Sequence, residues 1–355
     1  MKIEILQSEI QENDIDAYLI YNPINVQYFT GFITQSIARL IVQSQGTPLL
    51  FVPELEYEEA KLVAKNCLVK KIPAQELVIE AISRVLHKLK LKRIGIEEDY
   101  LTKKDYDDLT KYSHEIEYLN KESMIKKLRK TKTDDELEFL KEAAKIADIG
   151  MEKAIESIRD GISELEVAAL AEYEMRKNGS EPIPFDTIVA SGIRSAFPHA
   201  TTTKHKIKKG DFVIIDLGAQ FSGYVSDTSR TVIVGTPSEK QKEIYNLVLH
   251  AQEEAERRCK SGLKANELDN IARSIITSAN YGKYFNHSLG HGVGLEVHED
   301  PIISFRNNNK LEINNVITIE PGIYLPDFGG VRIEDTLIVK KDKCLLLNKS
   351  PKLKY

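Results

Sequence analysis

The sequence predicts two domains: an α/β domain over residues 1–122 and an α+β domain over residues 123–355 with an internal pseudo-two-fold repeat. Three observations lead to this prediction. The chain has 355 residues, more than one domain usually holds. Strand and helix signals alternate in its first third. Further on, two similar stretches of apolar and acidic residues occur, at 212–234 and 316–339.

Composition narrows the class of protein. Hydrophobic residues make up 42% of the chain, enough for sizeable cores. The 49 Lys and Arg against 54 Asp and Glu give a net charge of −5, which disfavours nucleic acid as a partner because such proteins usually carry a basic face. The three cysteines lack motif spacing and indicate a reducing compartment. No apolar run has signal-peptide or membrane-spanning length, so we expect a soluble cytoplasmic protein.

The first domain is predicted from alternating apolar runs and helical periodicity. The expected strands are Ala17–Tyr21, Leu40–Gln43, Pro48–Val52 and Arg93–Ile96, and the expected helices are Glu54–Lys65 and Glu76–Leu89. No dense cluster of His, Asp and Glu occurs here, so we expect the chemistry in the second domain. The segment Lys121–Lys132 is charged and lacks an apolar stripe, which favours a domain junction there.

The second domain begins with helices that carry start signals. A hydroxyl residue followed three positions later by Glu or Gln can form a capping box, in which each side chain satisfies a free backbone N–H. Such pairs are Thr133 with Glu136, Ser163 with Glu166, and Ser238 with Gln241. A fourth helix is expected over about Glu267–Ala279. The order helix, helix, strand pair occurs twice in this domain, which predicts a duplicated α+β unit.

Each repeat delivers two acids. The apolar run Phe212–Ile215 ends in Asp216, and its returning strand begins near Asp227; Glu320 and Glu334 hold the matching places in the second copy. Carboxylates that face one another repel and resist deprotonation unless a cation lies between them. Four carboxylates carry a charge that two divalent ions neutralise, so the pattern predicts a two-metal site. Oxygen ligands with a single imidazole admit Mn, Co, Fe or Zn.

That imidazole is His291, within the glycine-rich run 290–294. The run lacks the Lys-Ser/Thr of a phosphate-binding loop, which disfavours nucleotide binding. His199 and His298 could each donate a hydrogen bond to a developing oxyanion, or lie on the surface without a role. Arg332 shares a strand face with Glu334, so it could orient an acid ligand, bind a substrate carboxylate or form a structural ion pair. The remaining histidines of this domain, His205, His250 and His287, are interpreted as structural or solvated. Glu296 and Glu299 are not expected to be ligands, because four acids already fill the site.

The motifs resemble those of the pita-bread metallopeptidases, in the branch of Xaa-Pro aminopeptidases and proline dipeptidases (prolidases). The similar segments are PHA at 198–200, IIDLGAQFSGYVSDTSRT at 214–231, GHGVGLEVHEDP at 290–301, IEPGIYLPDFGGVRIEDT at 319–336 and, near the N-terminus, YNPINVQYFTGF at 21–32. The resemblance therefore covers nearly the whole chain. It implies a creatinase-like N-terminal domain followed by a pita-bread catalytic domain.

The resemblance also implies a function and a residue for each role. Enzymes of this kind hydrolyse the Xaa-Pro bond of dipeptides or longer peptides with a metal-bridging hydroxide as nucleophile, and they are usually homodimers. The implied ligands of two metal ions are Asp216, Asp227, His291, Glu320 and Glu334, with Asp227 and Glu334 bridging the ions. We expect Mn or Co in preference to Zn or Fe. Glu320 would also handle the water proton, and His199 and His298 would bind the scissile carbonyl. From its place on the strand face of Glu334, we also expect Arg332 to contact substrate.

One departure from the family leaves the length of the substrate open. Proline dipeptidases often carry a basic residue shortly after the position of His298, whereas here Ile302 and Ile303 follow and Arg306 is the first basic residue. Two other function classes remain as alternatives. One is a metal hydrolase that acts on a non-peptide amide, and the other is a non-catalytic binding protein on the same fold.

Overall fold

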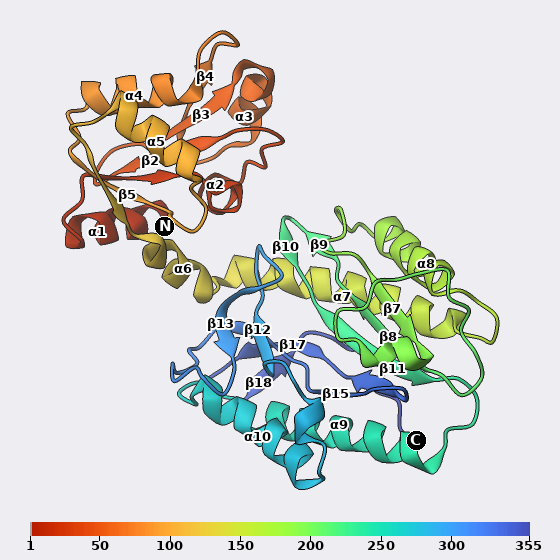
Figure 1. Cartoon of the computed structure of the whole chain (residues 1–355). Helices are drawn as coiled ribbons and strands as arrows, with labels where there is room; N and C mark the ends of the chain where they lie inside the picture. Colours follow the sequence, from red (N-terminus) through yellow and green to blue (C-terminus); the bar gives the residue numbers. More distant parts are fainter. Residues whose placement is uncertain (1) are drawn as a thin grey trace. The chain divides into compact units, whose positions relative to one another are not determined.

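The computed structural model describes residues 2–355 (Figure 1). The chain separates into two compact units, Met1–Leu128 and Arg129–Tyr355. Among residues 2–355, no helix combines the length and the apolar character needed to cross a membrane.

The first unit is built on one six-stranded sheet in the order β4-β3-β2-β1-β5-β6. Its strands are β1 (Ala17–Ile20), β2 (Arg39–Gln43), β3 (Leu49–Pro53), β4 (Leu68–Ile72), β5 (Arg93–Ile96) and β6 (Glu117–Asn120). Strand β2 pairs antiparallel with both β1 and β3. Strand β4 pairs parallel with β3, β5 pairs parallel with β1, and β6 pairs parallel with β5. The helices are α1 (Lys2–Glu12), α2 (Pro23–Thr30), α3 (Tyr57–Val63), α4 (Val78–Lys88) and α5 (Lys103–Tyr112), with α6 (Glu122–Lys130) at the junction.

The second unit repeats one arrangement. The first copy holds α7 (Asp134–Ser157), α8 (Glu164–Lys177), β7 (Ile188–Ser191), the 3-10 helix η2 (Gly192–Ala196), β8 (Phe212–Leu217), β9 (Gln220–Phe221), β10 (Tyr224–Val225) and β11 (Thr228–Ile233). The second copy holds α9 (Glu239–Arg258), α10 (Ala265–Ser278), the 3-10 helix η3 (Gly282–Tyr284), β12 (Gly290–Gly292), β13 (Glu299–Ile303), β14 (Val316–Ile319), β15 (Gly322–Leu325), β16 (Gly329–Arg332), β17 (Asp335–Val339) and β18 (Cys344–Leu346). The expected duplicated α+β unit is therefore confirmed.

The two predicted strand pairs form antiparallel ribbons. In the first, β8 pairs with β11 and Asp216 lies opposite Ser229. In the second, β14 pairs with β17 and Ile319 lies opposite Asp335. The connection within each ribbon holds a small hairpin, β9 with β10 in the first and β15 with β16 in the second.

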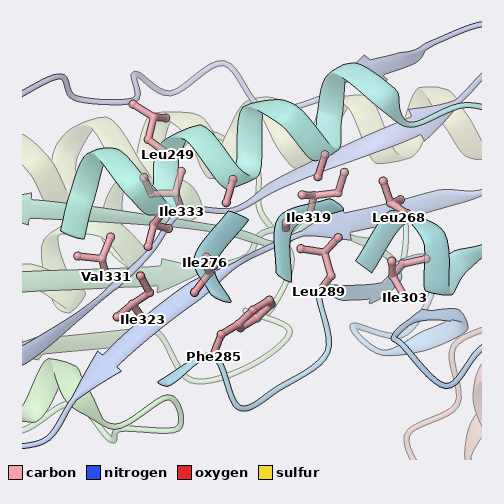
Figure 2. Packing of buried hydrophobic residues seen from close by; sticks show 14 of the residues in the cluster. Leu249, Leu268, Ile276, Phe285, Leu289, Ile303, Ile319, Ile323, Val331 and Ile333 are labelled. Atoms are coloured by element: carbon pink, nitrogen blue, oxygen red, sulfur yellow. The ribbon is translucent and has the colours of Figure 1, made fainter. Parts of the chain in front are cut away.

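Helices cover the strands from two sides. In Figure 1, α7 and α8 lie on one side of the strands of this unit, and α9 and α10 lie on the other. The three helix starts predicted from capping boxes all form them. Apolar residues from α9 and α10 pack on the second copy of the strands to make one core cluster, which includes Leu268, Phe285, Ile303 and Ile319 (Figure 2).

Candidate metal centre

The two ribbons meet edge to edge where the acids lie. An isolated antiparallel bridge joins Ser229 of the first ribbon to Glu334 of the second. The Glu334 N–H donates to the Ser229 carbonyl at 3.0 Å, and the Thr228 hydroxyl donates to the Glu334 carbonyl at 3.1 Å. Because Asp227 directly precedes β11 and Glu334 directly precedes β17, this bridge draws the acids of both repeats to one place.

Side chains from both repeats come within a metal ion's reach. Asp227, His291 and Glu334 each offer a ligand atom, and these atoms all lie within 4.8 Å of one another. The His291 Nε2 atom lies 3.6 Å from Asp227 Oδ2 and 3.3 Å from Glu320 Oε1. Three of the four acids and the imidazole predicted from sequence thus lie close together, and the fourth acid, Asp216, accepts a hydrogen bond from Arg332.

Two carboxylate oxygens at this centre lack a hydrogen-bond donor. Asp216 Oδ1 and Glu334 Oε1 are buried, and no donor within residues 2–355 reaches either. A buried charged oxygen without a partner is costly, since it has lost its water and gained nothing in return. The two orphaned atoms belong to acids from different repeats. Oxygen donors of this kind fit divalent metal ions, so the residues present suit a metal centre.

The pKa values at the centre reflect its crowding. Burial, and next the Asp216 carboxylate, raise the pKa of Asp227 well above its usual range; burial and then Asp227 do the same for Glu334. Burial opposes ionisation of Glu320 and of His291 as well, but these two pair with each other. The hydrogen bond to His291 lowers the pKa of Glu320 to about 2, and Glu320 raises the pKa of His291 to about 9.

Arg332 is a buried cation that contacts one of these acids. It is 4% exposed, so it lies inside the protein. Its Nη2 donates to Asp216 Oδ2 at 2.6 Å, and its Nε donates to the Ser229 hydroxyl at 2.9 Å. That hydroxyl in turn donates to Glu334 Oε2 at 2.8 Å. The Nη1 atom of Arg332 donates to the Tyr324 hydroxyl at 3.0 Å. All three guanidinium nitrogens of Arg332 are therefore occupied by protein groups, which favours the orienting role over contact with substrate.

The two remaining predicted histidines lie beside the centre. The His298 ring lies 4.2 Å from the His291 ring, measured between centroids. Burial, followed by the charge of His291, lowers the pKa of His298, and His199 contributes to the same shift. The His199 side chain is exposed, and the carbonyl of the preceding Pro198 accepts a hydrogen bond from Arg332 at 3.2 Å.

Glycines beside His291 are required by close backbone packing. A Cβ atom on Gly290 would lie 2.1 Å from the Thr318 carbonyl oxygen, and one on Gly292 would lie 2.2 Å from the Asp300 carbonyl oxygen. No side chain fits at such distances. These glycines allow β12 to lie between β13 and β14, and that position directs His291 toward the acids.

Three polar residues of the centre were not predicted as part of it. Ser229 links Arg332 to Glu334, and Tyr324 links Arg332 to His287, whose Nε2 lies 3.0 Å from the Tyr324 hydroxyl. Ser229 follows Asp227 by two positions, so strand alternation would have placed it on the same face. Tyr324 and His287 carry no such signal, since their contacts depend on how the chain folds back.

Comparisons with known proteins agree with this architecture. Residues 138–341 match the model of metallopeptidase family M24, and residues 2–131 match that of the creatinase/prolidase N-terminal domain. The chain is 43% identical to a Xaa-Pro dipeptidase of Pyrococcus horikoshii over 98% of this chain and 97% of that protein. It is 44% identical to the corresponding protein of Pyrococcus furiosus, over 98% of each.

Solved structures extend the similarity to three dimensions. The prolidase from Pyrococcus horikoshii superposes with a TM-score of 0.94 over 99% of each chain, at 43% identity. An X-Pro aminopeptidase from Thermotoga maritima superposes with a TM-score of 0.92 over 99% of each chain, at 36% identity. With its creatinase-type N-terminal domain and pita-bread catalytic domain, this chain belongs to metallopeptidase family M24.

Proposed function

We propose that this chain hydrolyses the peptide bond between an N-terminal residue and a following proline. The observation that carries the proposal is the meeting of Asp227, His291 and Glu334 where the two repeats join. Glu320 lies against His291, and two buried carboxylate oxygens have no donor among residues 2–355. The nearly full-length similarity to proteins named Xaa-Pro dipeptidase supports the choice of substrate. Proline lacks the N–H that a general aminopeptidase site could use, so a dedicated site suits it.

We infer that Asp216, Asp227, His291, Glu320 and Glu334 hold two divalent ions, Mn or Co. Bound ions of this type lower the pKa of water and polarise a carbonyl group. Asp227 and Glu334 are the most deeply buried of the four acids, at 5% and 1% exposed, which suits ligands shared between two ions.

The protein's own residues would perform the other steps. Glu320 would accept the proton of the attacking water at a carboxylate oxygen, and it would then pass that proton toward the leaving proline nitrogen. His298 and His199 would donate hydrogen bonds to the scissile carbonyl oxygen as it gains negative charge. Arg332 would keep Asp216 ionised and oriented through their 2.6 Å contact.

We infer the accepted length of the substrate from the residues that follow His298 in the chain. The apolar Ile302 is exposed on β13, and the Arg306 guanidinium lies 5.1 Å from the Phe305 ring centroid. A dipeptide's C-terminal carboxylate would therefore find no cation at Ile302. We expect the chain to accept the tripeptide Ala-Pro-Ala as well as Ala-Pro.

The test compares kcat/KM for Ala-Pro and Ala-Pro-Ala at controlled Mn²⁺ or Co²⁺, with Asp227→Ala as the inactive variant and Asp342→Ala, an exposed acid, as its control. We expect metal-dependent turnover in the control and its loss in Asp227→Ala, which should stay folded. If neither peptide is hydrolysed in a metal-dependent way, the proposal is rejected.

We further infer a cytoplasmic homodimer. The free state of Cys67, Cys259 and Cys344 is consistent with a reducing compartment, and the dimer rests on the resemblance to this family. Size-exclusion chromatography with light scattering tests the dimer, which a monomeric mass would contradict.

A further inference from the structure

The carboxylate of Glu164 closes the loop that carries His199. Glu164 is the first residue of α8 and is fully buried, with 0% exposed. Its Oε1 accepts from the Ser191 N–H and the Ser191 hydroxyl, both at 2.9 Å. Its Oε2 accepts from the Thr203 N–H at 3.1 Å and the Thr203 hydroxyl at 2.8 Å. One carboxylate thus joins the residue that begins the loop to the residue that ends it.

The same carboxylate also holds the interior of the loop. The Arg194 Nε lies 3.3 Å from each Glu164 oxygen, and the other arm of Arg194 donates to the Thr201 carbonyl. Arg194 and Thr201 flank His199 on its two sides in the chain. Because the His199 side chain is exposed, its position depends on the backbone that carries it.

The far side of the loop is hydrogen-bonded to the second ribbon, beside the candidate metal centre. The Gly330 N–H donates to the Ser195 hydroxyl at 2.8 Å, and Arg332 donates to the Pro198 carbonyl at 3.2 Å. The loop is therefore held between Glu164 at its base and the second ribbon at its tip. With either support removed, the imidazole of His199 would no longer have a defined place beside the centre.

A purely structural role for Glu164 in starting α8 is already filled by another residue. Ser163 and Glu166 form the capping box of this helix, and the Glu166 carboxylate accepts from the Ser163 N–H at 2.8 Å. The Glu164 side chain points instead to residues 191–203. A buried carboxylate is retained at a cost unless its charge is paired, and here Arg194, a residue of the loop itself, supplies the pairing.

We propose that Glu164 is a positioning residue for the reaction, which acts by holding His199 where it can contact the substrate carbonyl. The inference rests on the proposed function, in which His199 binds that carbonyl. A displacement of about 1 Å in such a group can lower the rate about 100-fold. Glu164 would therefore affect turnover without contacting substrate or metal.

The test uses Glu164→Gln, with Glu164→Asp as the conservative variant and Glu166→Gln as the matched control on the same helix. The amide nitrogen of a glutamine would face N–H and O–H donors of either Ser191 or Thr203, so one end of the loop would be released. We expect Glu164→Gln to lower kcat/KM for Ala-Pro about 10–100-fold, with unchanged Mn²⁺ affinity by calorimetry. Glu164→Asp keeps the charge and should recover part of the activity, and Glu166→Gln should match the wild type.

A double-mutant comparison tests whether the effect passes through His199. In a His199→Ala background, Glu164→Gln should lower kcat/KM by less than about threefold, because the group it positions is already gone. An equal loss in both backgrounds would overturn the proposal, and so would a loss of Mn²⁺ affinity in Glu164→Gln.

Hydrogen exchange separates this proposal from the proposed function. Glu164→Gln should speed amide exchange over residues 194–203 relative to Glu164→Asp, while exchange in β14 and β17 stays unchanged. If the wild type cleaved neither Ala-Pro nor Ala-Pro-Ala, the proposed function would be rejected, and the exchange result would still decide whether Glu164 holds the loop. Unchanged exchange over 194–203 would contradict the inference.

Discussion

Replacing Asp227 by asparagine should give a variant that is at least as stable as the wild type without metal and less stable than the wild type with metal. In the metal-free protein Asp227 is 5% exposed, and burial together with Asp216 raises its pKa well above its usual range. Asparagine has nearly the same shape without the charge, so the metal-free variant should be at least as stable as the wild type. Once metal is present, the wild type should become the more stable of the two, because the variant has lost a proposed ligand.

The size of the shift follows from linkage and from the size of the domain. A ligand present at 100 times its Kd stabilises the folded state by about 2.7 kcal/mol. The unit that holds the centre spans Arg129–Tyr355. In a domain of this size each kcal/mol moves Tm by about 2–4 °C, so one bound ion should raise Tm of the wild type by about 5–10 °C.

The assay is differential scanning calorimetry in EDTA and again with Mn²⁺. The control is Asp342→Asn, which removes an exposed carboxylate that is not among the proposed ligands and should behave as the wild type. We expect the order of Tm for wild type and Asp227→Asn to cross between the two conditions. An equal metal-dependent rise in Asp227→Asn, or none in the wild type, would refute the electrostatic reasoning.

Three further predictions concern other parts of the second unit. Arg332→Met removes the donor to Asp216 and should weaken Mn²⁺ binding about 10–100-fold by calorimetry; an unchanged affinity would exclude the orienting role. Burial, and next the Asp335 carboxylate, raise the pKa of Glu256 to about 8 from its usual 4.5. The protonated Glu256 side chain therefore contributes stability that is fully present below pH 4.5 and is lost as pH rises through about 8. Glu256→Gln should therefore gain stability relative to the wild type, on the order of a few kcal/mol, as pH rises from about 5 to about 9 in urea unfolding, and a constant difference would argue against this. Leu268→Ala, at a site with 0% exposed, should lower the free energy of unfolding by about 2–5 kcal/mol, and a loss below about 1 kcal/mol would mean that the site can collapse.

Local signals in the sequence determined a large part of the fold. The three capping boxes depend on residues three positions apart, and the apolar runs that end in acids depend on neighbours in one strand. Such patterns are complete within a few residues of chain. They were sufficient to predict the duplicated unit and the acids that each copy supplies. In the first unit and at its junction the signals were weaker, and helices α1, α2, α5 and α6 and strands β4 and β6 were not predicted.

Contacts between distant segments were decided only in the tertiary structure. The bridge between Ser229 and Glu334 joins residues of different repeats, and no local pattern specifies which edges will meet. The sequence left Arg332 with several roles, and the folded chain surrounds its guanidinium with Asp216, Ser229 and Tyr324.

Glu164 shows the same limit, because in sequence it is an ordinary first-turn acid of a helix. Spacing along the chain therefore determined which residues could carry the chemistry. The packing of buried surfaces determined which of them became neighbours, because only burial brings far segments together and leaves their charges to be satisfied by one another.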